Sequence, residues 1–519
     1  LEGRVLLSSA DILTYHNDVS RLGQNLHETI LTPRNVNAGT FGKRLFLPAD
    51  GKVDAQPLYV SGLSFRGRGK HNVVYVATEH DSVFAYDSDT GTALWQVSAL
   101  APDEVPSDPR NCNQVIPEIG ITSTPVIDRH MGPHGTIYVV AMSKDGAGHY
   151  FQRLHALDLT TGAEEFGGPR TVQATFPGTG DNSVNGNVVF DPAQYDDRAA
   201  LLLSHGIVYT TWASHCDIRP YTSWVIGYNA RTLKQASVLN LTPNGSNGAF
   251  WGSGGGPAVD SSGNIFLLEG NGTFDTTFNA KGFPTQGDFG NAFLQLSMRR
   301  GLHVTDYFDS FNQAQLNAMD LDLGSSEAMV LPSMKDASGR TRLLAVGAGK
   351  DGTIYVVDRK NMGEFNAVTP DNHNIYQQIS NVLAGGIFST PAYFNGLVYY
   401  GAVGDHLRAF RFSSARLSTN SVSESPTGFG YPGTSPSVSA NGRRNGIVWA
   451  VENGDNATLH AYDATNLANE LYNSNQAGVR DQLGLGNKFI TPAIAGGKVL
   501  VGTTDGVAVY GLLSTPSPS

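Results

Sequence analysis

The sequence predicts an all-β fold, an eight-bladed β-propeller, from three observations. A pattern of strands and turns recurs eight times along the 519 residues. Only 16% of residues are charged, against about 25% in an average domain, while there are 60 glycines and 25 prolines, which suits short strands joined by tight turns. The last repeat lacks one strand, and residues 41–50 near the N-terminus can supply it. This closure would remove the free sheet edges that favour aggregation.

Each repeat opens with a first strand of small residues, usually containing a proline. The eight segments are residues 55–60, 123–128, 187–191, 255–260, 330–334, 389–394, 434–439 and 490–495. Second strands such as VVYVAT are β-branched and aromatic, as in buried central strands. Third strands such as VFAYDSDTG end in a turn toward an outer fourth strand. Spacings of roughly 45 to 75 residues are typical of propeller blades with variable loops.

These repeats predict one large domain with short additions at both ends. Residues 41–513 are expected to form the propeller, residues 1–40 an extension that packs on it, and residues 514–519 a disordered tail. The only helical stretch expected is 311–320. A two-sheet sandwich with insertions is the alternative, but it explains neither the eightfold period nor the missing strand.

Charge and hydropathy exclude several classes of partner. The formal net charge of −11 leaves no basic stripe for nucleic acid. No apolar run is long enough to span a bilayer, so no membrane span is expected. The chain begins without methionine or a signal-peptide core, and we interpret it as the mature form of a secreted, extracellular or periplasmic protein.

Cysteine and asparagine positions bear on the same compartment. Cys112 and Cys216 are the only cysteines and are candidates for one disulfide between the loop before the second repeat and a loop of the third. Four Asn-X-Ser/Thr triplets would be surface glycosylation sites if the source modifies its secreted proteins, at Asn240, Asn244, Asn271 and Asn456.

Several segments resemble the quinoprotein dehydrogenases, which oxidise alcohols and sugars with pyrroloquinoline quinone (PQQ). TYHNDVSRLGQN, residues 14–25, is similar to the opening of these enzymes, and AYDSDTGTALW, 85–95, resembles the motif whose tryptophan docks one blade on the next. The similarity extends over nearly the whole chain. It implies the propeller fold, with PQQ and Ca²⁺ as candidate cofactors.

The resemblance also implies candidate ligands for the cofactors. GNGTFD, 270–275, is similar to a motif whose asparagine binds the metal, which makes Asn271 a candidate for both metal and cofactor binding. GKDGTIYVVDR, 349–359, resembles the strand whose basic residue contacts the quinone, which makes Lys350 the second candidate. Asp217 lies near the expected position of a metal-binding glutamate. Each of these residues also has an ordinary interpretation, as a turn or loop residue.

Other parts of the family's site are replaced. The tryptophan under the quinone falls at about Gly254, so Trp251 is the nearest aromatic candidate. The catalytic aspartate has no matching His-Asp segment, and Asp309 and Asp320 are the candidates for the base, with Asp322 nearby. Adjacent cysteines, which form a ring over the quinone in many members, do not occur.

Polar residues in loops and at strand ends offer a different site. Because loops of a propeller gather at the mouth of its channel, these residues could line a polar funnel that binds sugars or a metal. They are His16, His80, His149, His215, His406, Glu118, Asp54 and Asp405. As single residues, each is equally an ordinary turn or cap.

Three functions therefore stand beside one another. The first is a propeller with a degenerate PQQ site that binds or processes a carbohydrate or another polyol in its funnel. The second is an active PQQ- and Ca²⁺-dependent alcohol or sugar dehydrogenase. The third is a non-enzymatic extracellular scaffold that presents loops to partners or to further copies of itself.

Overall fold

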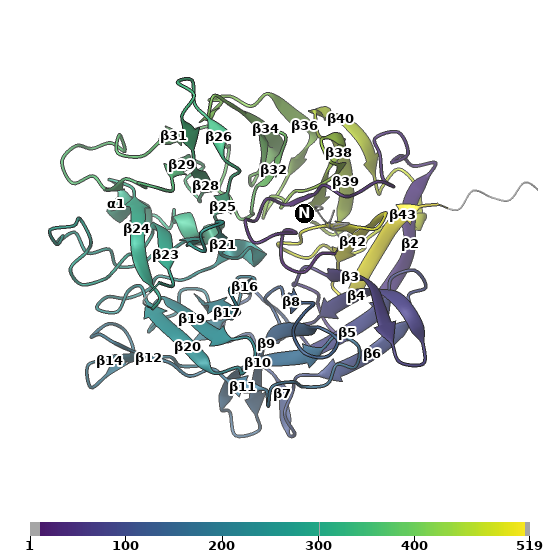
Figure 1. Ribbon diagram of the computed structural model, residues 1–519, viewed down its shortest axis with the longest axis horizontal. Helices are drawn as coiled ribbons and strands as arrows, with labels where there is room; N and C mark the ends of the chain where they lie inside the picture. The colour runs from purple at the N-terminus through teal and green to yellow at the C-terminus, as the bar shows by residue number, and fades with distance from the viewer. Residues whose placement is uncertain (1–10, 300, 514–519) are drawn as a thin grey trace, which may run out of the picture.

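The computed structural model describes residues 11–299 and 301–513, and the predicted tail 514–519 lies outside them. The chain is nearly all-β: eight sheets of four or five strands follow one another around a common centre (Figure 1). Within the described ranges the only α-helix is α1 (Gln313–Ala318), inside the predicted segment 311–320. No helix there is long and apolar enough to cross a bilayer.

The first strands of the first four sheets lie between residues 58 and 259. The first contains β3 (Leu58–Phe65), β4 (Gly69–Ala77), β5 (Ser82–Asp87) and β6 (Ala93–Ser98). The second contains β8 (Val126–Asp128), β9 (Thr136–Asp145), β10 (Tyr150–Asp158), β11 (Arg170–Thr171) and β7 (Glu104–Pro106). The third contains β16 (Leu202–Ser204), β17 (Ile207–Thr211), β19 (Trp224–Asn229) and β20 (Gln235–Asn240). The fourth contains β21 (Ala258–Val259), β22 (Ile265–Leu268), β23 (Phe293–Ser297), β24 (His303–Asp309) and β30 (Glu364–Phe365).

The other four sheets follow in chain order. The fifth contains β25 (Met329–Val330), β28 (Leu344–Ala348), β29 (Ile354–Asp358) and β31 (Gln377–Ile379). The sixth contains β32 (Ala392–Phe394), β33 (Leu397–Gly401), β34 (Asp405–Ser413), β35 (Arg416–Leu417) and β36 (Ser423–Phe429). The seventh contains β37 (Ser437–Asn441), β38 (Arg444–Glu452), β39 (Thr458–Asp463), β40 (Asn466–Asn473) and β1 (Gln24–Asn25). The eighth contains β41 (Ala493–Ala495), β42 (Lys498–Gly502), β43 (Gly506–Leu512) and β2 (Phe41–Pro48).

Short elements decorate these sheets. Three small sheets contain β12 (Thr175–Pro177), β13 (Ser183–Val184) and β14 (Asn187–Val189); β15 (Tyr195–Asp196) and β18 (Ala213–Ser214); and β26 (Met334–Lys335) and β27 (Thr341–Arg342). Single 3-10 turns lie at Gly252–Gly254, Leu323–Ser325 and Gly478–Arg480.

The predicted first strand of the third repeat is wrong. Residues 187–189 form β14, which pairs only with β12 and β13 outside the third sheet, and the first strand of that sheet is β16. A two-residue turn at His205 and Gly206, with φ of 51° and 74°, connects β16 to β17. Positive φ at both positions matches the twist of a tight hairpin. The apolar run at 187–191 has the sequence pattern of a first strand, whereas β16, with three residues, is too short to give a recognisable pattern.

The eighth sheet joins the two ends of the chain. Strand β2 runs antiparallel to β43, from Phe41 opposite Leu512 to Pro48 opposite Gly506. The ring of Phe41 is fully buried, and its centroid lies 5.4 Å from that of Trp449 and 5.0 Å from that of Tyr472. The N-terminal strand therefore contributes to the core between the seventh and eighth sheets.

Trp95 shows how neighbouring sheets dock. Its indole Nε1 donates to the carbonyl oxygen of Leu159 at 3.0 Å, beyond the end of the second sheet's β10. A Cβ atom at Gly162 would lie 2.8 Å from the Trp95 ring, so only glycine leaves room for the indole there. The tryptophan of the first sheet thus packs on the turn of the second.

Residues 12–28, which we call the central segment, make hydrogen bonds to all eight sheets. Main-chain hydrogen bonds link it to the first strands of six of the sheets. The side chains of Arg21 and Asn25 bond to the third and eighth sheets, or to the residue beside them. The partners, from the first sheet to the eighth, are Tyr59, Ile127, Leu201, Val259, Val330, Tyr393, Val438 and Ile494. The segment begins near the first sheet and ends near the eighth, so it follows the order of the ring.

Arg21 is the most heavily bonded residue of the central segment. Its side chain is fully buried, and its guanidinium donates to the carbonyl oxygens of Tyr15, Leu201, Gly256 and Pro257 and to Thr14 Oγ1. Beside it, the Tyr15 hydroxyl lies 3.1 Å from Thr491 Oγ1 in the eighth sheet. Arg21 and Tyr15 therefore form a polar hub in the central segment, between the sheets.

Candidate functional site

The polar candidates gather at one end of the sheets. Because first and second strands are antiparallel, residues that precede a first strand and residues that follow a second strand meet at the same end. We call this the entry end. Asp322 precedes β25 and Lys350 follows β28 in the fifth sheet, while Trp251 precedes β21 and Asn271 follows β22 in the fourth.

Four of these side chains, Asn271, Asp320, Asp322 and Lys350, form what we call the lysine cluster. Lys350 Nζ lies 2.6 Å from Asp320 Oδ1 and 2.7 Å from Asp322 Oδ1. The Asn271 amide donates to Asp320 Oδ1 at 2.6 Å. The structure thus brings together Asn271, Asp320 and Lys350, which the sequence singled out separately.

Backbone packing between neighbouring sheets holds the cluster. The Lys350 amide donates to the carbonyl oxygen of Asp322 at 3.0 Å, which joins the two loops of the fifth sheet. A Cβ atom at Gly324 would lie 2.3 Å from the Gly270 nitrogen, so the turn after Asp322 rests directly on the backbone before Asn271. Glycine at position 324 is what permits this approach of the fourth and fifth sheets.

Burial and charge act against each other at Asp322. The side chain is 1% exposed, and burial raises its pKa to about 6 although Lys350 lowers it. The pKa of Lys350 is itself raised, because the two carboxylates outweigh the opposing effect of its burial. The Oδ1 atom of Asn271 is buried and has no hydrogen-bond partner within the described ranges. The cluster therefore presents a free acceptor beside a strongly held ammonium group.

Asp217 lies close to this cluster without joining it. Its carboxylate is exposed and accepts a hydrogen bond from the Tyr221 hydroxyl at 2.6 Å. Its charge contributes to the raised pKa of Asp322. Asp217 therefore acts on the lysine cluster through its electrostatic field and not through a shared bond.

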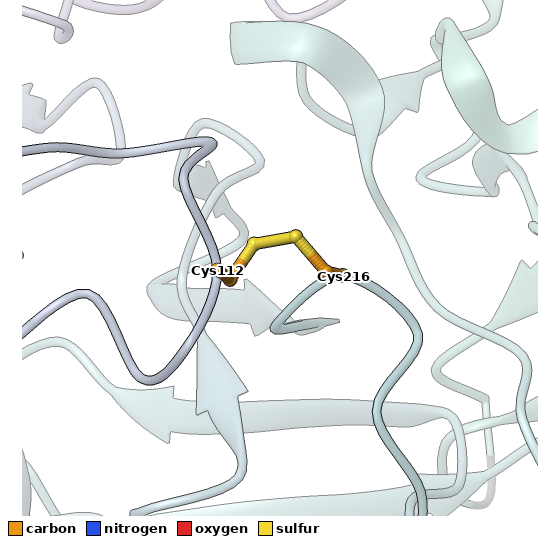
Figure 2. Close-up of a disulfide and its surroundings, with 2 residues drawn as sticks. All are labelled: Cys112 and Cys216. Atoms are coloured by element: carbon orange, nitrogen blue, oxygen red, sulfur yellow. A yellow bond between two sulfur atoms is a disulfide. The ribbon is translucent and has the colours of Figure 1, made fainter.

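The two cysteines are bonded at the same end. Figure 2 shows the Cys112–Cys216 disulfide, which joins the loop between β7 and β8 of the second sheet to a loop of the third, with the two Cα atoms 5.5 Å apart. Cys112 and Trp251 line one cavity together with Asp196, Arg198 and His215. Its volume is about 10 Å³, which is room for about one water molecule.

Arg198 and its neighbours form a second group that the sequence did not indicate. The Arg198 guanidinium lies 4.7 Å from the centroid of the Phe489 ring, and Lys488 Nζ lies 5.9 Å from the same centroid. Burial, together with the charges of Arg198 and Lys52, lowers the pKa of Lys488. Arg198 is 6% exposed, and its Nη1 atom has no partner in the described part of the chain.

Three carboxyl groups, those of Asp54, Glu79 and Asp196, lie beside these cationic side chains. Burial raises the pKa of Glu79 well above its usual range, and the neighbouring Asp54 raises it further. Burial also raises the pKa of Asp196, to about 6. Asp54 has a lowered pKa, because Lys52, Glu79 and Arg198 together outweigh its burial. Asp54 and Asp196 therefore lie among the cationic side chains of Arg198, Lys488 and Lys52.

Glu327 lies fully buried two residues before β25, and burial raises its pKa to about 8. Neither of its carboxylate oxygens has a hydrogen-bond partner among the described residues. The folded protein therefore holds a proton that the unfolded chain has released, and this contribution to stability is lost as the pH rises through the folded pKa.

We expect the Glu327→Gln variant to be more stable than the parent at pH 9 by about 5 kcal/mol, at about 1.4 kcal/mol per unit of the pKa shift from 4.5 to about 8. At pH 4, where both states are protonated, the two proteins should be equally stable. Thermal unfolding of both proteins between these limits measures the difference, and a pH-independent difference would contradict the assignment.

Asp309 lies apart from the lysine cluster. It faces another small cavity, lined also by Asn291, Asp351 and Tyr355. Its side chain is 1% exposed, and burial raises its pKa well above the usual range. Of the two candidate bases, only Asp320 therefore belongs to the lysine cluster. The buried carboxylate of that cluster is Asp322.

Three of the loop histidines have a partner of their own, whereas the buried Nε2 atom of His215 has none within the described ranges. His80 Nδ1 lies 2.9 Å from Glu118 Oε1, His149 Nδ1 2.9 Å from Asp145 Oδ2, and His406 Nδ1 3.2 Å from the Thr427 carbonyl oxygen. Asp405 accepts from Arg408 at 2.7 Å. His16 is buried in the central segment, where its ring bonds to the carbonyl oxygens of Arg21 and Pro436, so its expected place in a funnel is wrong.

Two of the four expected surface asparagines are not free at the surface. Asn240 is 2% exposed and donates to Thr222 Oγ1 at 2.8 Å. Asn271 is half-buried, with its amide committed to Asp320. The other two asparagines, Asn244 and Asn456, are exposed. Their amide groups donate to partners at the surface, Gln286 and Asn475. The sequence triplet alone does not distinguish these settings.

Comparisons with known proteins find structures of similar fold but no match by sequence. No family model matches the chain, and no curated protein matches it. Solved structures do: quinohemoprotein alcohol dehydrogenases from Pseudomonas putida HK5 and from Comamonas testosteroni each superpose with a TM-score of 0.64 at 14% identity, covering 98% of this chain and 82% of theirs. A europium-containing methanol dehydrogenase superposes with a TM-score of 0.62 at 12% identity, covering 97% of this chain and 98% of that one. The chain therefore has the β-propeller fold of the quinoprotein alcohol and methanol dehydrogenases.

Proposed function

We propose that the eight sheets are the blades of one closed ring, sealed by β2, and that its entry end binds a carbohydrate or another polyol. The pairing of β2 with β43 supports the closure. The observation that carries the function is the lysine cluster, in which carboxylates, an ammonium group and an unpaired amide oxygen come together from two sheets. Such groups accept and donate hydrogen bonds to hydroxyls from fixed positions.

The charge beside Phe489 favours a polyol that also carries a carboxylate. Three cationic side chains, those of Arg198, Lys488 and Lys52, gather here around Asp54. Arg198 keeps a buried N–H without a partner, and a carboxylate is the group that a guanidinium binds best. An aldonic or uronic acid combines both requirements.

The residues do not fit a calcium–quinone pair. The carboxylates that a hard cation would bind already lie against Lys350, and no three His, Cys, Asp or Glu side chains converge on a possible metal position in the described ranges. The cavity shared by Trp251 and the disulfide has a volume of about 10 Å³, far below that of a tricyclic quinone. We therefore derive no reaction step through PQQ.

The disulfide supports an extracytoplasmic location. Disulfides persist in oxidising compartments and are rare where thioredoxin and glutathione keep thiols reduced. Cys112 and Cys216 are the only cysteines, and they are bonded to each other. Secretion or export to a periplasm is thus part of the proposal.

Titration calorimetry with gluconate and sorbitol tests the proposed ligand, since the two differ mainly in one carboxylate. We expect gluconate to bind more tightly, by about three- to tenfold, the effect of roughly 1 kcal/mol from one charged contact. Lys350→Met should weaken both ligands by about tenfold or more, whereas Arg198→Met should remove the preference for gluconate. Lys335→Met, which changes an exposed lysine on β26, is the matched control and should have no effect.

Two outcomes would overturn this function. Binding of PQQ with Ca²⁺ that is lost in Lys350→Met, together with PQQ-dependent dye reduction in the presence of an alcohol, would establish the dehydrogenase instead. Failure to bind gluconate, sorbitol or PQQ would leave the non-enzymatic scaffold, for which concentration-dependent self-association is the next measurement.

A further inference from the structure

The largest of the cavities described lies at the outer strands of the third and fourth sheets and is lined by none of the residues of the lysine cluster. It has a volume of about 640 Å³, within the usual range for small-molecule sites. Its walls come from the third and fourth sheets, at the end of β20 and the start of β24, and from residues 279–287, which follow β22 in the chain. Figure 1 places β20 and β24 next to each other at the rim.

Most of the lining is apolar and aromatic. Leu239 and Phe289 are buried, while Phe176 and Phe283 are partly exposed toward the cavity mouth. The ring of Phe289 packs edge-on against Tyr307, with 5.4 Å between centroids, so this wall is anchored to the core of the fourth sheet. Aromatic walls of this kind bind flat apolar groups by stacked or edge-on contacts.

The polar lining groups are mostly committed elsewhere. Asn279 Oδ1 accepts from two backbone amides of its own loop, Thr285 Oγ1 donates to Asp275, and Asn240 donates to Thr222. Thr305 Oγ1 lies 3.0 Å from Gln295 Oε1. These side chains shape the cavity, and they leave little for a sugar to bind.

The charged lining groups are all basic. Lys281 and His303 are the only Lys, Arg, His, Asp or Glu residues that line the cavity. Three carboxylates lie in the surrounding segments: Asp275 accepts from Thr285 and the Gln286 amide, Asp288 accepts from the Asn244 amide, and Glu364 lies against Gly282, beside Lys281. No ion pair occupies Lys281 in the described part of the chain, so its charge is available to a ligand.

From these observations we infer a second binding site at the rim for an aromatic carboxylate. The flat group lies against Phe176, Phe283 and Phe289, and the carboxylate meets Lys281, with His303 on the same wall. A positive, aromatic cavity in a chain of net charge −11 selects an anion that is otherwise apolar. This inference is independent of the polyol site, which lies at the entry end.

Calorimetric titration with cinnamate and with cinnamyl alcohol, its neutral analogue, tests the site. We expect cinnamate to bind more tightly by about three- to tenfold, as for one partly exposed charge contact. Lys281→Met should remove this preference and leave the alcohol unchanged. Gln286→Trp, which places a bulky side chain at the exposed wall, should abolish binding of both.

Lys335→Met on β26 serves as the control and should bind cinnamate like the parent protein. Thermal unfolding of each variant checks that the fold is retained. The inference is overturned if cinnamate does not bind, or if it binds equally well to the parent, Lys281→Met and Gln286→Trp proteins. Competition by gluconate would likewise overturn it, because the ligand would then occupy the entry end.

Discussion

Replacing Arg21 by methionine is expected to lower the free energy of unfolding by about 3–5 kcal/mol, the range for removing one member of a buried charged network. The substitution leaves five acceptors without their donor, in the central segment and beside the third and fourth sheets. Each buried unpaired acceptor costs about 1–3 kcal/mol if water cannot reach it. Partial relaxation around the methionine keeps the total below the sum of these costs.

Differential scanning calorimetry at neutral pH measures this effect. Arg231→Met is the matched control, because Arg231 is exposed and should tolerate the change within about 0.5 kcal/mol. Arg21→Lys separates charge from geometry, since an ammonium group cannot reproduce the spread of a guanidinium fork. Unchanged stability of Arg21→Met would show that the central segment does not hold the sheets together.

The second large effect is expected at Phe41, where the Phe41→Ala substitution should lower the free energy of unfolding by about 3–5 kcal/mol. The Phe41 side chain is fully buried, and its ring contacts Trp449, Tyr472 and Tyr510 between the seventh and eighth sheets. Its removal leaves a cavity at the place where the N-terminal strand meets the C-terminal one. The strand should then detach at lower temperature than the other sheets.

Phe46 on the same strand provides the control for that prediction. It is 39% exposed, so Phe46→Ala should cost roughly a third as much. Hydrogen exchange of the β43 amides reports directly on the pairing with β2. If both variants lose the same stability, or if β43 stays protected in Phe41→Ala, the core contact of β2 does not control the closure.

Much of the fold could be predicted because it repeats. First strands such as 123–128 and 490–495 carry the same small residues and proline, and their second strands are uniformly apolar. The position of β2 followed from counting strands. The third repeat failed because a longer apolar run at 187–191 outweighed the three-residue strand β16, whose signal is the His205-Gly206 turn.

The candidate site could be predicted only where a local motif existed. Asn271 and Lys350 lie in recognisable strand-end segments, and both side chains contact the carboxylate of Asp320. Arg198, Glu327 and Phe489 belong to no motif. Aligning the residues immediately before every first strand would have pointed to them, since that position in successive repeats faces the entry end.

The central segment has a consequence for the order of folding. Residues 12–28 leave the ribosome before the strands that they bond to, because their hydrogen-bond partners extend from Tyr59 to Ile494. Contacts this distant in sequence form slowly, because loop closure must come before they stabilise the chain. The Arg21 side chain therefore stays hydrated until the third and fourth sheets have formed, and the Asn25 side chain until the eighth has formed. The central segment is therefore synthesised before the sheets that it bonds to and becomes ordered only after them, so a nascent chain that stalls before residue 494 holds an incomplete hub.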